Sequence, residues 1–177
     1  MAPHQLTRVA QLTQRTNQFN LSGRRRDEAE VAELAARDDH AVLAVEVEDR
    51  FGAYGLTGVV IARRESEQLV VDSFLLSCRV LGRRVERAIL AALGRIAANW
   101  GCTRILAPCV PTERNEPIRQ FLAQAPWTLA AENQYVCAVA AATQAVPGVA
   151  LSEDHVFAPP APATANEATQ STVPPAP

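Results

Sequence analysis

The fold is decided by the stretch Phe74-Leu75-Leu76-Ser77-Cys78-Arg79-Val80-Leu81-Gly82-Arg83-Arg84-Val85-Glu86. The residues that lead into it, from Leu69 to Leu76, are apolar and rich in strand-forming side chains, so they predict a buried strand. From Gly82 the period becomes helical, which predicts a helix up to Asn99 whose inner face carries Val85, Ala88, Ile89, Ala92, Leu93 and Ile96. The stretch is therefore a turn that joins a buried strand to the start of a helix.

This turn combines the groups that hold phosphates in proteins. A glycine, free main-chain N–H groups and the positive end of a helix dipole coincide there with several arginines. We therefore expect Arg79, Gly82, Arg83 and Arg84 to bind a phosphate or a pyrophosphate. Cys78 lies on the rim of the same site, where positive groups would activate its thiol as a nucleophile. The alternative is that Cys78 merely ends a buried strand.

Composition limits the classes of function. The chain has 177 residues with 48% hydrophobic residues and a net charge of −2, which fits one domain plus a tail and does not favour a nucleic-acid partner. All 17 basic residues are arginines, and the absence of lysine excludes Schiff-base chemistry. No apolar run is long enough to span a membrane, and the N-terminal sequence does not resemble a signal peptide, so we expect a cytoplasmic protein without a membrane partner.

The cysteines and histidines do not form a metal-binding pattern. The four cysteines contain no CxxC pair, and the three histidines lie far apart, so we expect neither a metal site nor a disulfide. Cys102, Cys109 and Cys137 are interpreted as small apolar residues of the core.

A change in composition divides the chain into two parts. Residues 1–144 form the folded domain, whereas residues 145–177 are rich in proline and alanine and lack basic residues, which predicts a disordered tail. In the domain we predict helices near 6–13, 27–37, 82–99 and 115–124 and strands near 41–48, 56–62, 68–76, 104–107, 127–130 and 135–142. The element order is α-α-β-β-β-α-β-α-β-β.

Other polar residues outside the turn are candidates for the site. His40 could act as the general base for Cys78, although a single loop histidine is more often only exposed to solvent. Asn17, Asn20 and Asn115 could orient an acyl carbonyl, or they could cap helices and turns.

The hairpin tip between the first two strands adds three further candidates. Asp49, Arg50 and Phe51 could bind the hydroxyl groups of a substrate, and the alternative is that they stabilise the turn.

Four segments together resemble a known family. The element order, with a glycine turn after the third strand, resembles the GNAT acyltransferases without their first strand. The segments 14–21, 49–58, 74–86 and 111–115 closely resemble the C-terminal half of FkbH-like proteins, which are bifunctional enzymes of polyketide biosynthesis. The resemblance covers roughly residues 5–127. It implies an α/β GNAT-like fold, with a mixed and mostly antiparallel sheet flanked by helices.

The resemblance also implies an activity, which is the transfer of a glyceryl-type acyl group to the phosphopantetheine thiol of an acyl carrier protein, with Cys78 as the nucleophile that carries the acyl group as a thioester. Three features depart from the related families. The HAD-type phosphatase half of FkbH-like proteins has no match here, so a separate phosphatase could be the partner. Arg84 stands where the GNAT pyrophosphate loop ends in glycine or alanine, and Phe121-Leu122 replaces the pair that often carries the GNAT general-acid tyrosine.

Two other functions stay open from the sequence. The chain could be a GNAT enzyme that uses an acyl-coenzyme A directly, with no covalent intermediate on Cys78. It could also be a non-catalytic module that binds a carrier protein or a HAD partner.

Overall fold

The computed structural model describes residues 3–152. It contains five α-helices within this range, α1 Pro3–Arg15, α2 Glu28–Ala35, α3 Val85–Asn99, α4 Glu116–Leu122 and α5 Val139–Ala142, and one 3-10 turn, η1 Cys78–Val80. Its strands are β1 Phe19–Asn20, β2 His40–Asp49, β3 Gly52–Glu65, β4 Gln68–Leu76, β5 Arg104–Pro108, β6 Thr128–Ala131 and β7 Gln134–Ala138.

The strands form one twisted sheet in the order β2-β3-β4-β5-β7-β6, and β1 pairs with β4 outside this path. In the described part of the chain β4 and β5 are the one parallel pair, since α3 crosses back between them, and the remaining pairs are antiparallel. The expected mixed, mostly antiparallel sheet is confirmed.

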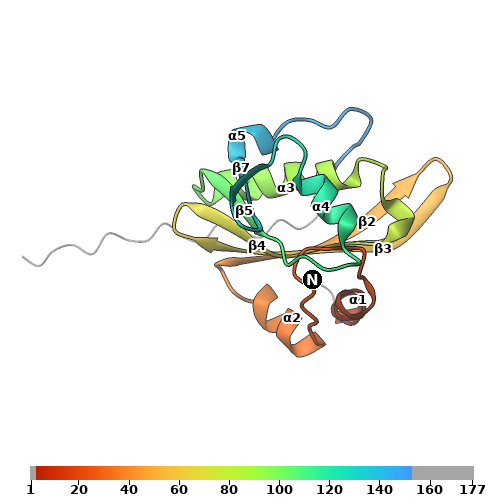
Figure 1. Ribbon diagram of the computed structural model, residues 1–177. Coiled ribbons are helices and arrows are strands. Elements are labelled where there is room, and N and C mark those ends of the chain that lie inside the picture. The colour runs from red at the N-terminus through yellow and green to blue at the C-terminus, as the bar shows by residue number, and fades with distance from the viewer. Residues whose placement is uncertain (1–2, 153–177) are drawn as a thin grey trace, which may run out of the picture.

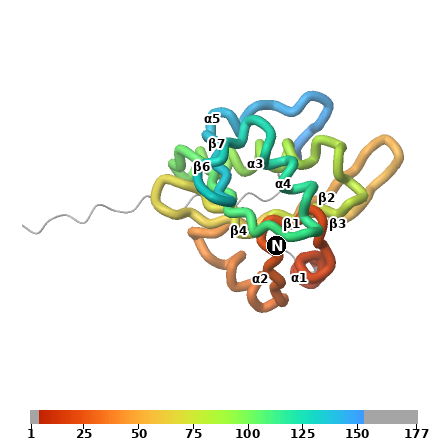
Figure 2. Tube along the Cα trace, viewed as in Figure 1, coloured from red at the N-terminus to blue at the C-terminus, as the bar shows by residue number. Residues whose placement is uncertain are grey.

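Helices cover both faces of the sheet, with α1 and α2 on one face and α3, α4 and α5 on the other (Figure 1, Figure 2). Each face has its own apolar core. On the α1–α2 side Val9 and Val31 pack over Ile61 and Leu75. On the α3 side the larger core includes Phe19, Phe74, Leu93, Ile105 and Trp127. Burial on both faces explains why the β4 sequence is almost continuously apolar.

The parallel strands β4 and β5 stay paired only at Gln68–Val70, near the start of β4. Further along, the β4 edge that β5 leaves pairs with β1, where Phe19 lies opposite Leu76 and Asn20 opposite Leu75. Leu21 then donates its N–H to the Phe74 oxygen, 3.1 Å away, and its oxygen accepts the N–H of Val110 at 2.9 Å. Residues 19–21 therefore close the gap between the ends of β4 and β5.

Three of the differences from the sequence expectations have a clear physical reason. The polar segment around Phe19 contains a short strand, because the free edge of β4 supplies its hydrogen-bond partners. The helix expected from Gly82 begins at Val85, after a 3-10 turn. The last expected strand ends at Ala138, and the residues after it form α5 because they pack on α3, where a Cβ added at Gly94 would lie 3.0 Å from the Ala142 Cβ.

The boundary between domain and tail lies partly outside the described residues. Residues 145–152 continue from α5 along α3, and Ala145, Val146 and Val149 line a hollow there together with Ala91. The rest of the segment that the sequence assigns to a tail, residues 153–177, lies outside the described range. Among residues 3–152 no helix has both the length and the apolar character needed to cross a membrane.

Candidate functional site

Cys78 begins the turn that follows β4, and its side chain is exposed. Ser77 links the end of β4 to this turn, and its N–H donates to the Thr57 oxygen on β3 at 2.7 Å. The other three cysteines also lie in the described range and are buried, and burial raises the pKa of their thiols, that of Cys137 to about 11. Cys78 is therefore the thiol available for chemistry.

The main-chain N–H of Gly82, which was predicted to bind a phosphate, donates instead to a side chain at the start of α3. Gly82 has a φ of +75°, as the turn requires of a glycine, and its N–H donates to the Glu86 Oε1 at 2.9 Å. Glu86 lies in the first turn of α3 and is buried. A carboxylate thus stands where the sequence suggested a phosphate oxygen.

The predicted phosphate-binding arginines also have partners within the chain. Arg83 Nη1 donates to Asp49 Oδ2 at 2.5 Å, and Arg84 Nη1 donates to the oxygen of Pro147 at 2.7 Å. Arg79 is exposed, and its Nε donates to the hydroxyl of Ser77 at 3.3 Å. Of the three arginines predicted to bind phosphate, Arg79 is the one whose guanidinium has no carboxylate or carbonyl partner among residues 3–152.

Asp49, the last residue of β2, joins the β2–β3 hairpin to Arg83 in the turn before α3. Asp49 accepts the Phe51 N–H at 2.8 Å, the hydroxyl of Tyr54 at 3.0 Å and the guanidinium of Arg83, and these contacts hold its pKa below the usual value, the Phe51 N–H most of all. Arg83 also stacks on the ring of Tyr54, 4.9 Å from its centroid. The sequence candidates of the hairpin and of the turn are therefore neighbours in space.

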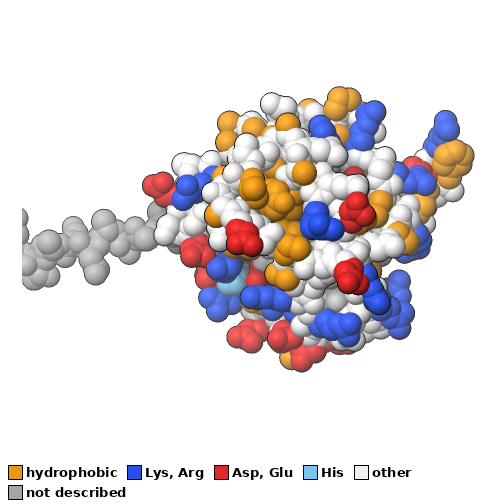
Figure 3. Space-filling model, viewed as in Figure 1, with side chains coloured by type: hydrophobic (Ala, Val, Ile, Leu, Met, Phe, Trp, Pro, Cys, Tyr) orange, Lys and Arg blue, Asp and Glu red, His pale blue; other side chains and the backbone are white. Residues whose placement is uncertain are grey.

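The end of the hairpin projects from the body of the protein. Phe51 is 77% exposed, and the guanidinium of Arg50 lies 4.6 Å from the centroid of its ring. The space-filling view shows this apolar and basic tip beyond the rest of the surface (Figure 3). An exposed aromatic beside a cation is available for contact with a partner.

A polar pocket of about 280 Å³ lies where β1 and the segment after β5 meet. It brings together all three asparagines that the sequence proposed, and its lining residues are Asn17, Asn20, Gly23, Thr112, Glu113, Arg114 and Asn115. The sequence analysis did not name Thr112, Glu113 and Arg114 as site residues, although they belong to the segment 111–115 that carried part of the family resemblance. Cys78 does not line this pocket.

Two of these asparagines mainly organise the main chain. Asn115 is 2% exposed and donates from Nδ2 to the oxygens of Asn20 at 3.1 Å and Val110 at 2.8 Å. Asn20 donates to the Thr16 oxygen and accepts the Gly23 N–H. The alternative interpretation, turn and loop bonding, therefore describes Asn20 and Asn115, whereas Asn17 is exposed at the pocket wall.

His40 lies at the opposite end of the sheet from Cys78, so the structure does not bring this candidate general base to the thiol. His40 on β2 pairs with Arg63 on β3, and Arg63 pairs with Val70 near the start of β4. Cys78, in contrast, lies beyond Leu76 at the end of β4. Strand spacing puts these two levels about 17–20 Å apart. His40 instead contacts Asp39, with its Nδ1 2.7 Å from the Asp39 Oδ1.

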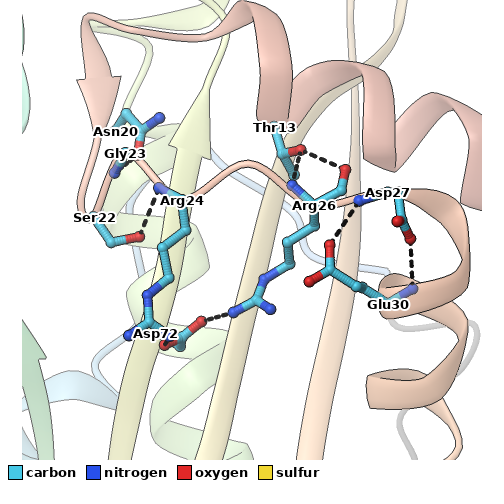
Figure 4. A network of polar contacts seen from close by, with 9 residues as sticks. All are labelled: Thr13, Asn20, Ser22, Gly23, Arg24, Arg26, Asp27, Glu30 and Asp72. Carbon is cyan, nitrogen blue, oxygen red and sulfur yellow. Dashed lines mark hydrogen bonds and ion pairs between the residues drawn. The ribbon is translucent and has the colours of Figure 1, made fainter.

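A charged cluster that the sequence analysis did not select fixes the loop between α1 and α2. Asp72 is the extra residue of a β-bulge in β4, and both Arg24 and Arg26 form ion pairs with it (Figure 4). Thr13 accepts the N–H of Arg26, which ties the same loop to α1 (Figure 4). A carboxylate inside an apolar strand was the signal in the sequence. The cluster holds residues 23–26 beside the pocket.

Among residues 3–152 no group of three His, Cys, Asp or Glu side chains is arranged to hold a metal ion.

Comparison with known proteins supports the fold. No protein-family model and no curated protein matches the sequence. Ard1 from Thermoplasma volcanium is similar in structure, with a TM-score of 0.55 and 15% identity over 78% of this chain and 93% of that chain. The chain has the fold of the GNAT acetyltransferases.

Two further similar structures contain coenzyme A. Rv2747 from Mycobacterium tuberculosis, in complex with CoA and NLQ, has a TM-score of 0.53 and 14% identity over 75% of each chain. The aminoglycoside acetyltransferase AAC(6')-Ib in complex with coenzyme A has a TM-score of 0.53 and 15% identity over 80% of this chain and 93% of that chain. Identities at this level show the fold alone.

Proposed function

We propose that the protein is an acyltransferase that moves an acyl group, of the glyceryl type, to the phosphopantetheine thiol of an acyl carrier protein through a thioester on Cys78. The observation that carries this proposal is the exposed thiol of Cys78, placed at the end of β4 and before α3 in a GNAT fold. The buried cysteines have no comparable access to a donor.

The chemistry balances without a metal or an oxidant. The Cys78 thiolate attacks the carbonyl carbon of a thioester donor, a C–S bond forms to Cys78, and the donor thiol leaves with the proton that Cys78 released. The thiolate of the carrier arm then attacks the Cys78 thioester and frees Cys78. Each step exchanges one thioester for another, so the reaction is nearly isoenergetic.

The proposal gives binding roles to four exposed residues besides Cys78. The amide of Asn17 and the guanidinium of Arg114, at the exposed wall of the pocket, would hold the hydroxylated acyl group. The side chains of Arg79 and Arg50 would meet the carrier protein, because carrier proteins are typically acidic around the serine that bears the arm. A HAD-type phosphatase is proposed as a further partner.

A second function is favoured by the coenzyme A in two structures of the same fold. In this alternative an acyl-coenzyme A donates directly to an amine or hydroxyl acceptor, and Cys78 carries no acyl group.

Mass spectrometry of the intact protein separates the two functions. The wild-type chain is incubated with acyl thioester donors and then with a holo carrier protein, beside the variants Cys78→Ala and Cys102→Ala. We expect an acyl adduct on wild type and on Cys102→Ala, its discharge on addition of the carrier, and no adduct on Cys78→Ala. Acyl transfer that persists in Cys78→Ala would favour the direct mechanism.

A further inference from the structure

Glu86 already accepts the hydrogen bond from the Gly82 N–H, which an incoming phosphate would need. Its Oε1 accepts the Gly82 N–H at 2.9 Å, and its side chain lies in the first turn of α3 with only 9% of the residue exposed. No other side chain caps the start of α3, since Arg84 at the N-cap position has a φ of +64° and makes no side-chain capping bond. The Glu86 carboxylate therefore supplies the negative charge at the N-terminus of α3, where a bound phosphate would otherwise lie.

A second carboxylate engages the adjacent cation. Asp49 accepts from Arg83 at 2.5 Å and is fixed in place by the Phe51 N–H and the Tyr54 hydroxyl. Across the turn, two carboxylates of the chain thus contact Gly82 and Arg83. An external anion at this point has to compete with both of them.

The cost of that competition depends on the charge of the ligand. Coenzyme A has a pyrophosphate and a 3′-phosphate, whereas a carrier-borne arm is attached through a single phosphodiester with one negative charge. Repulsion between like charges rises with the charge of the ligand, and it is strong where one of the charges is partly buried. The fixed carboxylate of Glu86 therefore disfavours coenzyme A more than a carrier-borne arm.

We propose that Glu86 is a specificity-determining residue, which lowers the affinity of the turn for coenzyme A and so favours the arm of a carrier protein. The inference rests on the proposed function and deepens it, because it names the residue that selects between the two sources of the same pantetheine arm.

The test is calorimetric binding of coenzyme A and of pantetheine, the uncharged part of the arm, to wild type and to Glu86→Gln. Glutamine keeps an oxygen that accepts the Gly82 N–H, so the turn is preserved while the charge is removed. The matched control is Glu28→Gln, which removes an exposed carboxylate from the first turn of α2.

We expect Glu86→Gln to bind coenzyme A about tenfold more tightly than wild type, because removal of one charge near a phosphate is a change of this order. Pantetheine binding should be the same for both proteins, and Glu28→Gln should behave as wild type. If Glu86→Gln does not fold, Glu86→Ala is measured instead, and it should also bind coenzyme A more tightly.

Two results would overturn the inference. One is equal affinity of wild type and Glu86→Gln for coenzyme A, and the other is an equal gain in affinity for pantetheine. Failure of the proposed function would look different, since Cys78 would then form no acyl adduct while the effect of Glu86 on coenzyme A binding persisted.

Discussion

The side-chain amide of Asn115 donates to the main-chain oxygen of Asn20, 3.1 Å away, across 95 residues of sequence. The same nitrogen donates to Val110, and the Oδ1 of Asn115 accepts the N–H of Thr112 at 2.9 Å. One buried side chain thus joins β1 to the segment after β5. This segment and β1 form the polar pocket, so Asn115 determines its shape.

The first prediction concerns this junction. Asn115→Asp keeps the size of the side chain but turns a negative oxygen toward two carbonyl oxygens, so the free energy of unfolding should fall by about 3 kcal/mol. Urea unfolding measures the loss. Asn17→Asp, at an exposed position of the same pocket, is the control and should change stability by less than about 0.5 kcal/mol. Equal effects of the two substitutions would contradict the role given to Asn115.

The second prediction concerns the backbone at Arg84. Its φ of +64° is costly for any residue with a Cβ, and both Arg84→Gly and Arg84→Ala lose the hydrogen bond to Pro147. The glycine variant should therefore be more stable than the alanine variant by about 1 kcal/mol. Thermal or urea unfolding of the pair measures the difference, and an alanine variant as stable as the glycine variant would argue against a left-handed residue at this helix start.

The third prediction concerns thiol reactivity in the folded protein. Since burial raises the pKa of Cys102, Cys109 and Cys137 and hides their sulfur atoms, only Cys78 should react rapidly with a thiol reagent at neutral pH. The colour released by a disulfide reagent counts the reactive thiols. Cys78→Ala should leave no fast phase, and all four thiols of wild type should react once the chain is unfolded. A second fast thiol in the native protein would refute this.

The fourth prediction concerns acid stability through Asp39. The hydrogen bonds from Arg37 and then His40 hold the pKa of Asp39 well below its usual value. A lowered pKa in the folded state contributes stability that is present above the unfolded pKa of about 4 and is lost as the pH falls through the folded pKa.

Asp39→Asn removes this contribution. The variant should therefore unfold at a lower temperature than wild type at neutral pH, and the difference should shrink as the pH falls below about 4. Thermal unfolding at several pH values measures it. Asp38→Asn, at an exposed neighbouring position, is the control and should follow wild type throughout. A constant difference across the pH range would exclude the ionised Asp39 carboxylate as the cause.

The elements with a clear local pattern were predictable from the sequence. The strand Gln68–Leu76 has the predicted bounds, because a continuous apolar run suits a strand that is buried on both faces. The helix after it was expected three residues too early, since apolar spacing does not show where a turn ends. The carboxylate of Asp72 within an apolar strand was visible in the sequence, but its two arginine partners lie 46 and 48 residues away.

The sequence named candidate residue types but did not indicate which of them lie together. Asn17, Asn20 and Asn115 meet at one pocket, and Asp49 meets Arg83, although neither meeting follows from spacing in the sequence. His40 and Cys78 do not meet for the same reason, because register along β2, β3 and β4 decides which residues share one level of the sheet.

By itself, the sequence determined the alternation of strands and helices, the turn at Gly82 and the single thiol beside it, because these depend on side chains a few positions apart. The tertiary structure alone decided that residues 19–21 close the gap between β4 and β5. It also decided that Glu86 accepts from Gly82, that Asp49 accepts from Arg83, and that His40 lies far from Cys78. Except for the bond between Glu86 and Gly82, these relationships join segments distant in the chain. They are fixed by strand register and by the need of buried polar groups for partners, which no local pattern of residues encodes.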